Sequence, residues 1–208
     1  MKKALIVVDI QNDFCPGGAL AVNKGDEIIP YVNALMTSKK YDLIIATKDW
    51  HPSSHKSFAH NNYKKEYELF ELGGLPQVMW PSHCVQGSRG ADFHPDLESA
   101  SINKTFYKGT NPEVDSYSGF FDNDKKSSTG LDAYLRSQNV DRVDVVGLAL
   151  DYCVKATALD AQALGFKTSV ILSATAAVNL NPEDGQIAQE ELVSKDVQLL
   201  TQEIKKVS

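Results

Sequence analysis

The chain has 208 residues, and its 27 acidic and 21 basic side chains give a formal net charge of −6. This charge argues against nucleic acid or an anionic membrane surface as the main partner. Hydrophobic residues make up 42% and charged residues 23%, as in an ordinary soluble globular protein. The length fits one domain over residues 1–208.

The N-terminal residues resemble a signal peptide only briefly, because the apolar run is short and no small-residue cleavage site follows it. No apolar stretch in the sequence is long enough to span a bilayer. The odd number of cysteines (Cys15, Cys84 and Cys153) fits free thiols in a reducing cytosol better than a disulfide framework. We therefore expect a cytoplasmic protein that does not associate with membranes.

Apolar runs alternate with helical patterns along the chain, which predicts an α/β fold. Six strands are expected at Lys3–Ile10, Leu43–Thr47, Ser101–Tyr107, Val143–Val146, Lys167–Leu172 and Val197–Thr201. Helices are expected at Gly25–Lys39, Thr129–Gln138 and Pro182–Leu192, and between Asp151 as N-cap and Gly165 as C′ residue. This alternation implies right-handed crossovers, and hence a three-layer α/β/α arrangement around a parallel six-stranded sheet.

Polar side chains follow four of the predicted strands at the point where each strand ends. These residues are Asp9, Asp49, Lys108 and Cys153. Ligands bind beyond the carboxyl ends of the strands in such sheets, so we expect these side chains to meet in one site. The long polar region from His51 to about Ser99 is expected to be an elaboration of that site.

Cys153 falls in the first turn of a predicted helix, where unpaired backbone N–H groups and the helix dipole favour a thiolate. The alternative is a small buried side chain that only packs beneath the sheet. As a nucleophile, Cys153 needs a base and a cation nearby. Asp9 and Lys108 could supply these from two other strand ends, and a histidine of the long polar region is the alternative base.

All five histidines lie between residues 51 and 94. Asp49 and His51 are two residues apart in an extended segment, so their side chains share one face. Together they suit Zn²⁺, Fe²⁺ or Mn²⁺, and His83 in a proline-stiffened turn is our candidate for the third ligand. Cys84 is an alternative for that position, whereas His94, directly before Pro95, is typical of a turn residue. The turn before Cys153 could also direct the backbone amides of Ala149 and Cys153 at one point as an oxyanion hole.

Six blocks of sequence resemble, in order, the motif series of nicotinamidases, which belong to the isochorismatase-like cysteine hydrolase superfamily. The blocks are Asp9–Phe14, Lys48–Pro52, Trp80–Val85, Tyr107–Gly109, Asp115–Phe120 and Gly147–Val154. The resemblance runs from residue 4 to about residue 201. It implies the isochorismatase-like hydrolase fold and hydrolysis of nicotinamide to nicotinate and ammonia for NAD salvage, with pyrazinamide as a further substrate.

The resemblance also implies a role for each matched residue. Cys153 corresponds to the nucleophile, Asp9 to the acid/base and Lys108 to the third member of the triad. The metal ligands are Asp49, His51 and His83; zinc or another divalent ion is usual, and it holds the pyridine nitrogen of the substrate. Further matches are the ring-pocket residues Phe14, Trp80 and Tyr117, the oxyanion-hole amides of Ala149 and Cys153, a cis peptide between Leu148 and Ala149, and a secondary position at His55.

One residue departs from the family pattern. Leu150 stands where the motif usually has Thr, which removes a hydroxyl beside the turn. Other hydrolases of the same fold, such as isochorismatases and N-carbamoyl amidases, generally lack the Asp-x-His and distant His set present here. A non-catalytic relative would not need Asp9, Lys108 and Cys153. Relatives are often homo-oligomers, but the sequence leaves the oligomeric state and the bound metal open.

Overall fold

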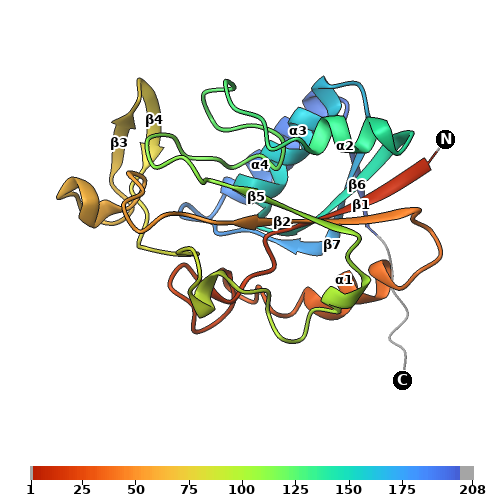
Figure 1. Cartoon of the computed structure of the whole chain (residues 1–208), viewed down its shortest axis with the longest axis horizontal. Coiled ribbons are helices and arrows are strands. Elements are labelled where there is room, and N and C mark those ends of the chain that lie inside the picture. The colour runs from red at the N-terminus through yellow and green to blue at the C-terminus, as the bar shows by residue number, and fades with distance from the viewer. Residues whose placement is uncertain (1, 202–208) are drawn as a thin grey trace.

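The computed structural model describes residues 2–201, and a parallel six-stranded sheet runs through the molecule (Figure 1). The order of the strands across the sheet is β5-β2-β1-β6-β7-β8, and every neighbouring pair is parallel. The strands are β1 (Lys2–Val8), β2 (Leu43–Asp49), β5 (Lys104–Lys108), β6 (Val140–Leu148), β7 (Lys167–Ala176) and β8 (Gln198–Leu200). The predicted fold class and six-stranded parallel sheet are confirmed.

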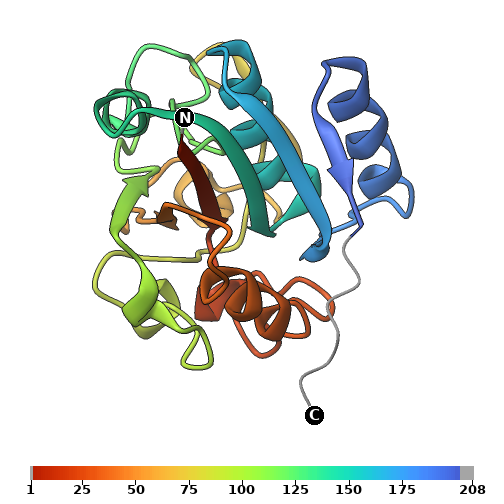
Figure 2. The same cartoon turned by 90° about the vertical axis from the view of Figure 1, so that its right-hand side faces the viewer.

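Helices cover both faces of this sheet (Figure 2). One face packs against α1 (Ile29–Met36), and the other against α2 (Leu131–Ser137), α3 (Lys155–Ala163) and α4 (Asp184–Ser194). Side chains of a strand point alternately to the two faces. In β1, Leu5 and Val7 therefore join the core beneath α1, while Ala4 and Ile6 join the core on the opposite face. This is the predicted three-layer arrangement.

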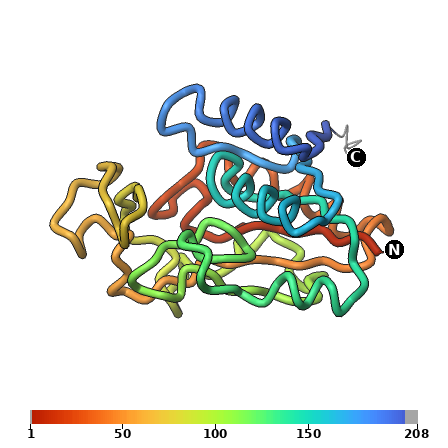
Figure 3. The backbone as a smooth tube through the Cα atoms, turned by 90° about the horizontal axis from the view of Figure 1, so that it is seen from above, coloured from red at the N-terminus to blue at the C-terminus, as the bar shows by residue number. Residues whose placement is uncertain are grey.

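The long polar region after β2 contains a hairpin that the sequence analysis did not predict. Its strands are β3 (Leu69–Leu72) and β4 (Leu75–Val78), and they pair antiparallel. Gly73 and Gly74 both have positive φ, as a two-residue hairpin turn requires. The hairpin projects from the end of the sheet where the strands have their carboxyl ends (Figure 3). Short 3-10 helices lie at Asn12–Phe14, Ala59–Asn62, Arg89–Ala91 and Ser99–Ser101.

Several predicted boundaries are displaced. Helix α1 begins at Ile29 and not at Gly25, because Pro30 is tolerated only in the first turn of a helix. The third strand of the sequence prediction begins at Lys104, since Ser99–Ser101 forms a 3-10 helix. Strand β7 continues to Ala176, beyond the predicted end at Leu172.

The predicted N-cap at Asp151 is wrong. A π-helical turn, Leu150–Val154, precedes α3, and Asp151 lies inside it. Its carboxylate accepts hydrogen bonds from the amides of Val178 and Asn179, at 2.9 and 2.8 Å. Asp151 therefore ties the turn that carries Cys153 to the segment after β7.

Within residues 2–201 no helix combines the length and the apolarity needed to cross a membrane. The extent of a single domain over residues 1–208 stays a prediction, and residues 1 and 202–208 of that range lie outside the described part.

The end of β6 depends on a glycine. Gly147 has a φ of +113°, and a Cβ at this position would lie 2.1 Å from the carbonyl oxygen of Val8. We expect Gly147→Ala to lower the free energy of unfolding by about 2–5 kcal/mol, from the left-handed backbone and the overlap together. Gly165→Ala is the control, because Gly165 has a φ of +89° and a Cβ added there would meet no atom within 4 Å. It should lose only about 1–2 kcal/mol in urea denaturation, and equal losses would contradict this account.

Candidate active site

The carboxyl ends of four parallel strands bring the predicted site residues together. Asp9 directly follows β1, Asp49 ends β2, Lys108 ends β5, and Cys153 lies in the turn after β6. Strands β5, β2, β1 and β6 are consecutive neighbours in the sheet. All four side chains are buried, so the site lies beneath the surface of the molecule.

The ammonium of Lys108 is the centre of this cluster. Its Nζ lies 2.9 Å from Asp9 Oδ2 and 3.3 Å from Cys153 Sγ. The same Nζ donates to the carbonyl oxygen of Ser116 at 3.0 Å and to Asp49 Oδ1. Lys108 therefore joins the thiol to both carboxylates.

Burial and neighbouring charges have opposite effects on the pKa values of Lys108 and Asp49. Burial would lower the pKa of the Lys108 ammonium, but Asp49 and Asp9 raise that pKa well above its usual range. Burial would likewise raise the pKa of Asp49, but Lys108 and then His51 hold it well below the usual value. Lys108 is therefore charged and Asp49 ionised at neutral pH.

Burial and helix position have opposite effects on the pKa of the Cys153 thiol. Burial raises the pKa of Cys153 well above its usual value, and Lys108 offsets only part of this effect. Burial also raises the pKa of Asp9, against the opposing charge of Lys108. A base close to the sulfur would therefore be needed to remove the proton of Cys153. An oxygen of Asp9 lies within 4.8 Å of the sulfur.

The turn before Cys153 has an unusual backbone. The peptide bond between Leu148 and Ala149 is cis, which confirms the prediction made from the family resemblance. Ala149 then precedes the π-helical turn, and its carbonyl oxygen accepts hydrogen bonds from the amides of Tyr152 and Val154, at 3.1 and 3.0 Å. The oxyanion-hole role of Ala149 and Cys153 stays a prediction.

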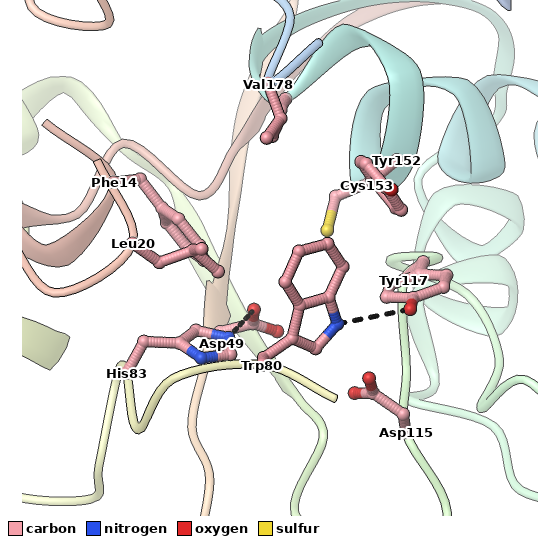
Figure 4. Close-up of a pocket in the computed structure, with 11 residues that line it drawn as sticks. Phe14, Leu20, Asp49, Trp80, His83, Asp115, Tyr117, Tyr152, Cys153 and Val178 are labelled. Atoms are coloured by element: carbon pink, nitrogen blue, oxygen red, sulfur yellow. Dashed lines mark hydrogen bonds and ion pairs between the residues drawn. The ribbon is translucent and has the colours of Figure 1, made fainter. Parts of the chain in front are cut away.

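A pocket opens onto the sulfur of Cys153 (Figure 4). Figure 4 shows the sulfur directed at the indole of Trp80, with Phe14 facing it across the pocket. The indole N–H of Trp80 donates to the hydroxyl of Tyr117 at 3.2 Å. The lining is mostly aromatic and aliphatic, and it also contains two carboxylates, an imidazole and the thiol. Its residues are Phe14, Leu20, Asp49, Trp80, His83, Asp115, Tyr117, Ala149, Tyr152, Cys153 and Val178.

Asp49, His51 and His83 converge beside this pocket. Asp49 Oδ2 lies 3.6 Å from His51 Nε2 and 3.7 Å from His83 Nε2. The Nδ1 atoms of the two histidines hydrogen-bond the carbonyl oxygens of Gly109 and Pro81, each at 2.8 Å. These bonds assign the proton to Nδ1 and leave Nε2 as the lone-pair donor.

The donor set fits a divalent cation on two grounds. His51 Nε2 is buried and has no hydrogen-bond partner, so its lone pair is free for a ligand. Burial would lower the pKa of His51, but Asp49 raises it, which shows that the site favours positive charge. One carboxylate oxygen and two imidazole nitrogens suit zinc, iron or manganese.

The other candidate ligands lie differently. His55 is buried, its ring centroid is 4.3 Å from that of His51, and its Nε2 also lacks a partner. Burial and then His51 lower the pKa of His55 to about 4. Cys84 and His94 belong to no cluster of possible ligands among residues 2–201, so the structure favours His83 as the third ligand.

Several site residues were missed in the sequence, among them the pocket residues Leu20, Tyr152 and Val178 and three that hydrogen-bond other site residues. Thr47 donates to Asp9 Oδ1 at 2.7 Å, and Gln77 donates to Asp115 Oδ2 at 2.8 Å. Gln11 is fully buried and binds the backbone of Asp49. Gln11 lies inside the first matched block, so the sequence held a signal for it, but nothing marks Gln77 before the hairpin is known.

Comparison with known proteins gives a consistent relationship. The isochorismatase domain family matches residues 3–202. A nicotinamidase of Escherichia coli (strain K12) is 47% identical over 96% of this chain and 94% of its own length. A nicotinamidase/pyrazinamidase structure from Acinetobacter baumanii has a TM-score of 0.93 at 43% identity, over 96% of each chain.

A pyrazinamidase of Pyrococcus horikoshii, solved in complex with zinc, has a TM-score of 0.79 at 39% identity and covers 97% of this chain and 100% of its own. These matches extend over nearly the whole chain, and so include all four strand ends of the site. The chain therefore belongs to the isochorismatase family and is closely related to the nicotinamidases within it.

Proposed function

We propose that this protein is a nicotinamidase, which hydrolyses nicotinamide to nicotinate and ammonia. The observation that carries the proposal is the thiol of Cys153, 3.3 Å from the ammonium of Lys108 at the wall of an aromatic pocket. Aromatic side chains such as Phe14 and Trp80 suit a flat heteroaromatic ring. Relatives named nicotinamidase support the same reaction, and those named pyrazinamidase support pyrazinamide as a second substrate.

The first half of the proposed reaction forms a thioester. Asp9 takes the proton of Cys153 as the sulfur bonds to the carboxamide carbon, and the electrons of the C=O bond move to its oxygen. The backbone amides of Ala149 and Cys153 would hold that oxyanion. Lys108 stabilises the developing thiolate. The C=O bond then re-forms as the C–N bond breaks, and Asp9 returns the proton to the departing nitrogen, which leaves as ammonia.

The second half hydrolyses the thioester. Asp9 takes a proton from water as the water oxygen bonds to the acyl carbon. The C–S bond then breaks, and Asp9 gives the proton to the sulfur of Cys153. Nicotinic acid leaves and ionises to nicotinate. The raised pKa of Asp9 suits a group that must both accept and donate a proton.

Asp49, His51 and His83 would hold a divalent cation, and we propose zinc because the Pyrococcus horikoshii structure was solved in complex with zinc. When bound, the cation would supply a Lewis acid for the pyridine nitrogen of the substrate. Asp49 has a second role here, because its Oδ1 also accepts from Lys108. The same carboxylate thus orients the lysine of the triad.

The nucleophile is tested with Cys153→Ala. We expect the kcat for ammonia release from nicotinamide to fall at least about 10³-fold, because no other group can form the thioester. Cys15→Ala is a matched control, since Cys15 is also a buried free cysteine but lies in the core beneath α1. It should retain activity in the same ammonia assay. Hydrolysis that persists in Cys153→Ala would refute the mechanism.

The metal site is tested with two variants that the structure separates. We expect His83→Ala to raise the KM for nicotinamide at least about tenfold with a smaller change in kcat, through lost anchoring of the ring. Asp49→Ala should lower kcat as well, because Asp49 also binds Lys108. His94→Ala is the control, since His94 lies near Asp96 and outside the site. Steady-state kinetics and zinc content check these results, and an unchanged KM in both variants would contradict the metal role.

In a plot of kcat/KM against pH, the fall on the acidic side (the acid limb) should report the protonation of Asp9. The Thr47 hydroxyl donates to Asp9 and stabilises its ionised form, which lowers the pKa of Asp9. Thr47→Val removes this bond, so the pKa rises and the acid limb should move up by about one pH unit. Thr47→Ser keeps the hydroxyl and should leave the limb in place. A Thr47→Val profile that matches the native one would exclude Asp9 as the titrating base.

A further inference from the structure

Gln11 and Asp13, which closely follow Asp9, bind the backbone of Asp49 and of the residue after His83. The Gln11 side chain is fully buried, and the Asp13 carboxylate reaches the turn that follows His83. No step of the proposed reaction uses either side chain. Both bind main-chain atoms, which suggests a role in holding the backbone.

Gln11 binds the main chain of Asp49 at two points. Its Nε2 donates to Asp49 O at 2.8 Å, and its Oε1 accepts from Asp49 N at 2.8 Å. The β1–β2 register ends at Val7 opposite Ala46, so the backbone of β1 does not reach Asp49. The side-chain amide of Gln11 therefore takes the place of a neighbouring strand at the end of β2.

The same amide makes a third bond. Gln11 Nε2 donates to Ala91 O at 3.0 Å, so both of its N–H groups and its oxygen are engaged. Removing the side chain would leave buried backbone groups of Asp49 and Ala91 without partners, which is costly. The position of Asp49 is thus fixed from the β1 side by Gln11 and from the other side by strand β5.

Asp13 is connected to the backbone of both His51 and His83 through Cys84. Its Oδ2 accepts from Cys84 N at 2.7 Å, and Cys84 directly follows His83. The carbonyl oxygen of Cys84 in turn accepts from His51 N at 3.1 Å. One buried residue therefore connects Asp13 to the backbone of His51 and His83.

We propose that Gln11 and Asp13 are positioning residues of the metal site: they fix the backbone of Asp49, His51 and His83 so that the three side chains converge before a cation binds. This inference rests on the metal site of the proposed function. Ligands held in place by neighbouring hydrogen bonds bind metal more tightly, because binding then costs less ordering. His51 and His83 come from loops, where such support matters most.

The test is the zinc dissociation constant of folded, metal-free protein, measured by competition with a chelating indicator. We expect Gln11→Met and Asp13→Ala to weaken zinc binding about 10- to 100-fold. Asp13→Asn keeps an oxygen for Cys84 N and should restore part of the affinity. The control is Asn103→Leu: Asn103 Oδ1 accepts from Ile44 N at 2.7 Å, at the opposite end of β2. It should leave the zinc affinity within about twofold, even where the melting temperature falls.

The inference is overturned if Gln11→Met and Asp13→Ala lose thermal stability but bind zinc as tightly as Asn103→Leu. If Gln11→Met fails to fold, the difference between Asp13→Ala and Asp13→Asn decides the question. A native protein that does not bind zinc would refute the metal site and this inference together. The zinc titration is independent of nicotinamide hydrolysis, so a failure of the proposed reaction would be seen separately, in Cys153→Ala.

Discussion

The structure of the site depends on one buried ammonium. An ion without partners in a protein interior costs several kcal/mol, and Lys108 is removed from water completely. Asp9 and Asp49 offset this cost, but two carboxylates facing one ammonium leave an excess of negative charge. Burial is the main cause that raises the pKa of Asp9, and the nearby charge of Asp49 adds to it; the charge of Asp49 also raises the pKa of His51 against the effect of burial. The parallel sheet makes the cluster possible, because neighbouring strands place their carboxyl ends side by side.

Asp49 is shared by two chemical centres. Its Oδ1 faces Lys108, and its Oδ2 faces the Nε2 atoms of His51 and His83. The group that would form the thioester and the group that would hold the ring are therefore separated by a single carboxylate. Cys153, Asp49 and His83 line the same pocket, and most of the remaining lining is apolar.

The sequence predicted the sheet and the four strand ends because these follow from local periodicity and from a rule of topology. It failed where the outcome depends on packing between distant segments. Asp151 looked like an N-cap, but it binds amides 27 and 28 residues away. Gln77 acts only once the hairpin has brought it to Asp115. Such contacts have no signature in the spacing of residues.

The long sequence separations in the cluster have a consequence for how the protein is made. Lys108 is 59 residues from Asp49 and 45 from Cys153. During synthesis, a chain that has emerged only as far as β5 holds the lysine and both carboxylates, but it lacks the strand that covers Asp9 on its other side. The ammonium then stays hydrated, and no pocket exists. The catalytic cluster is therefore complete only when β6 has joined the sheet, because β6 leads into the turn that carries Cys153.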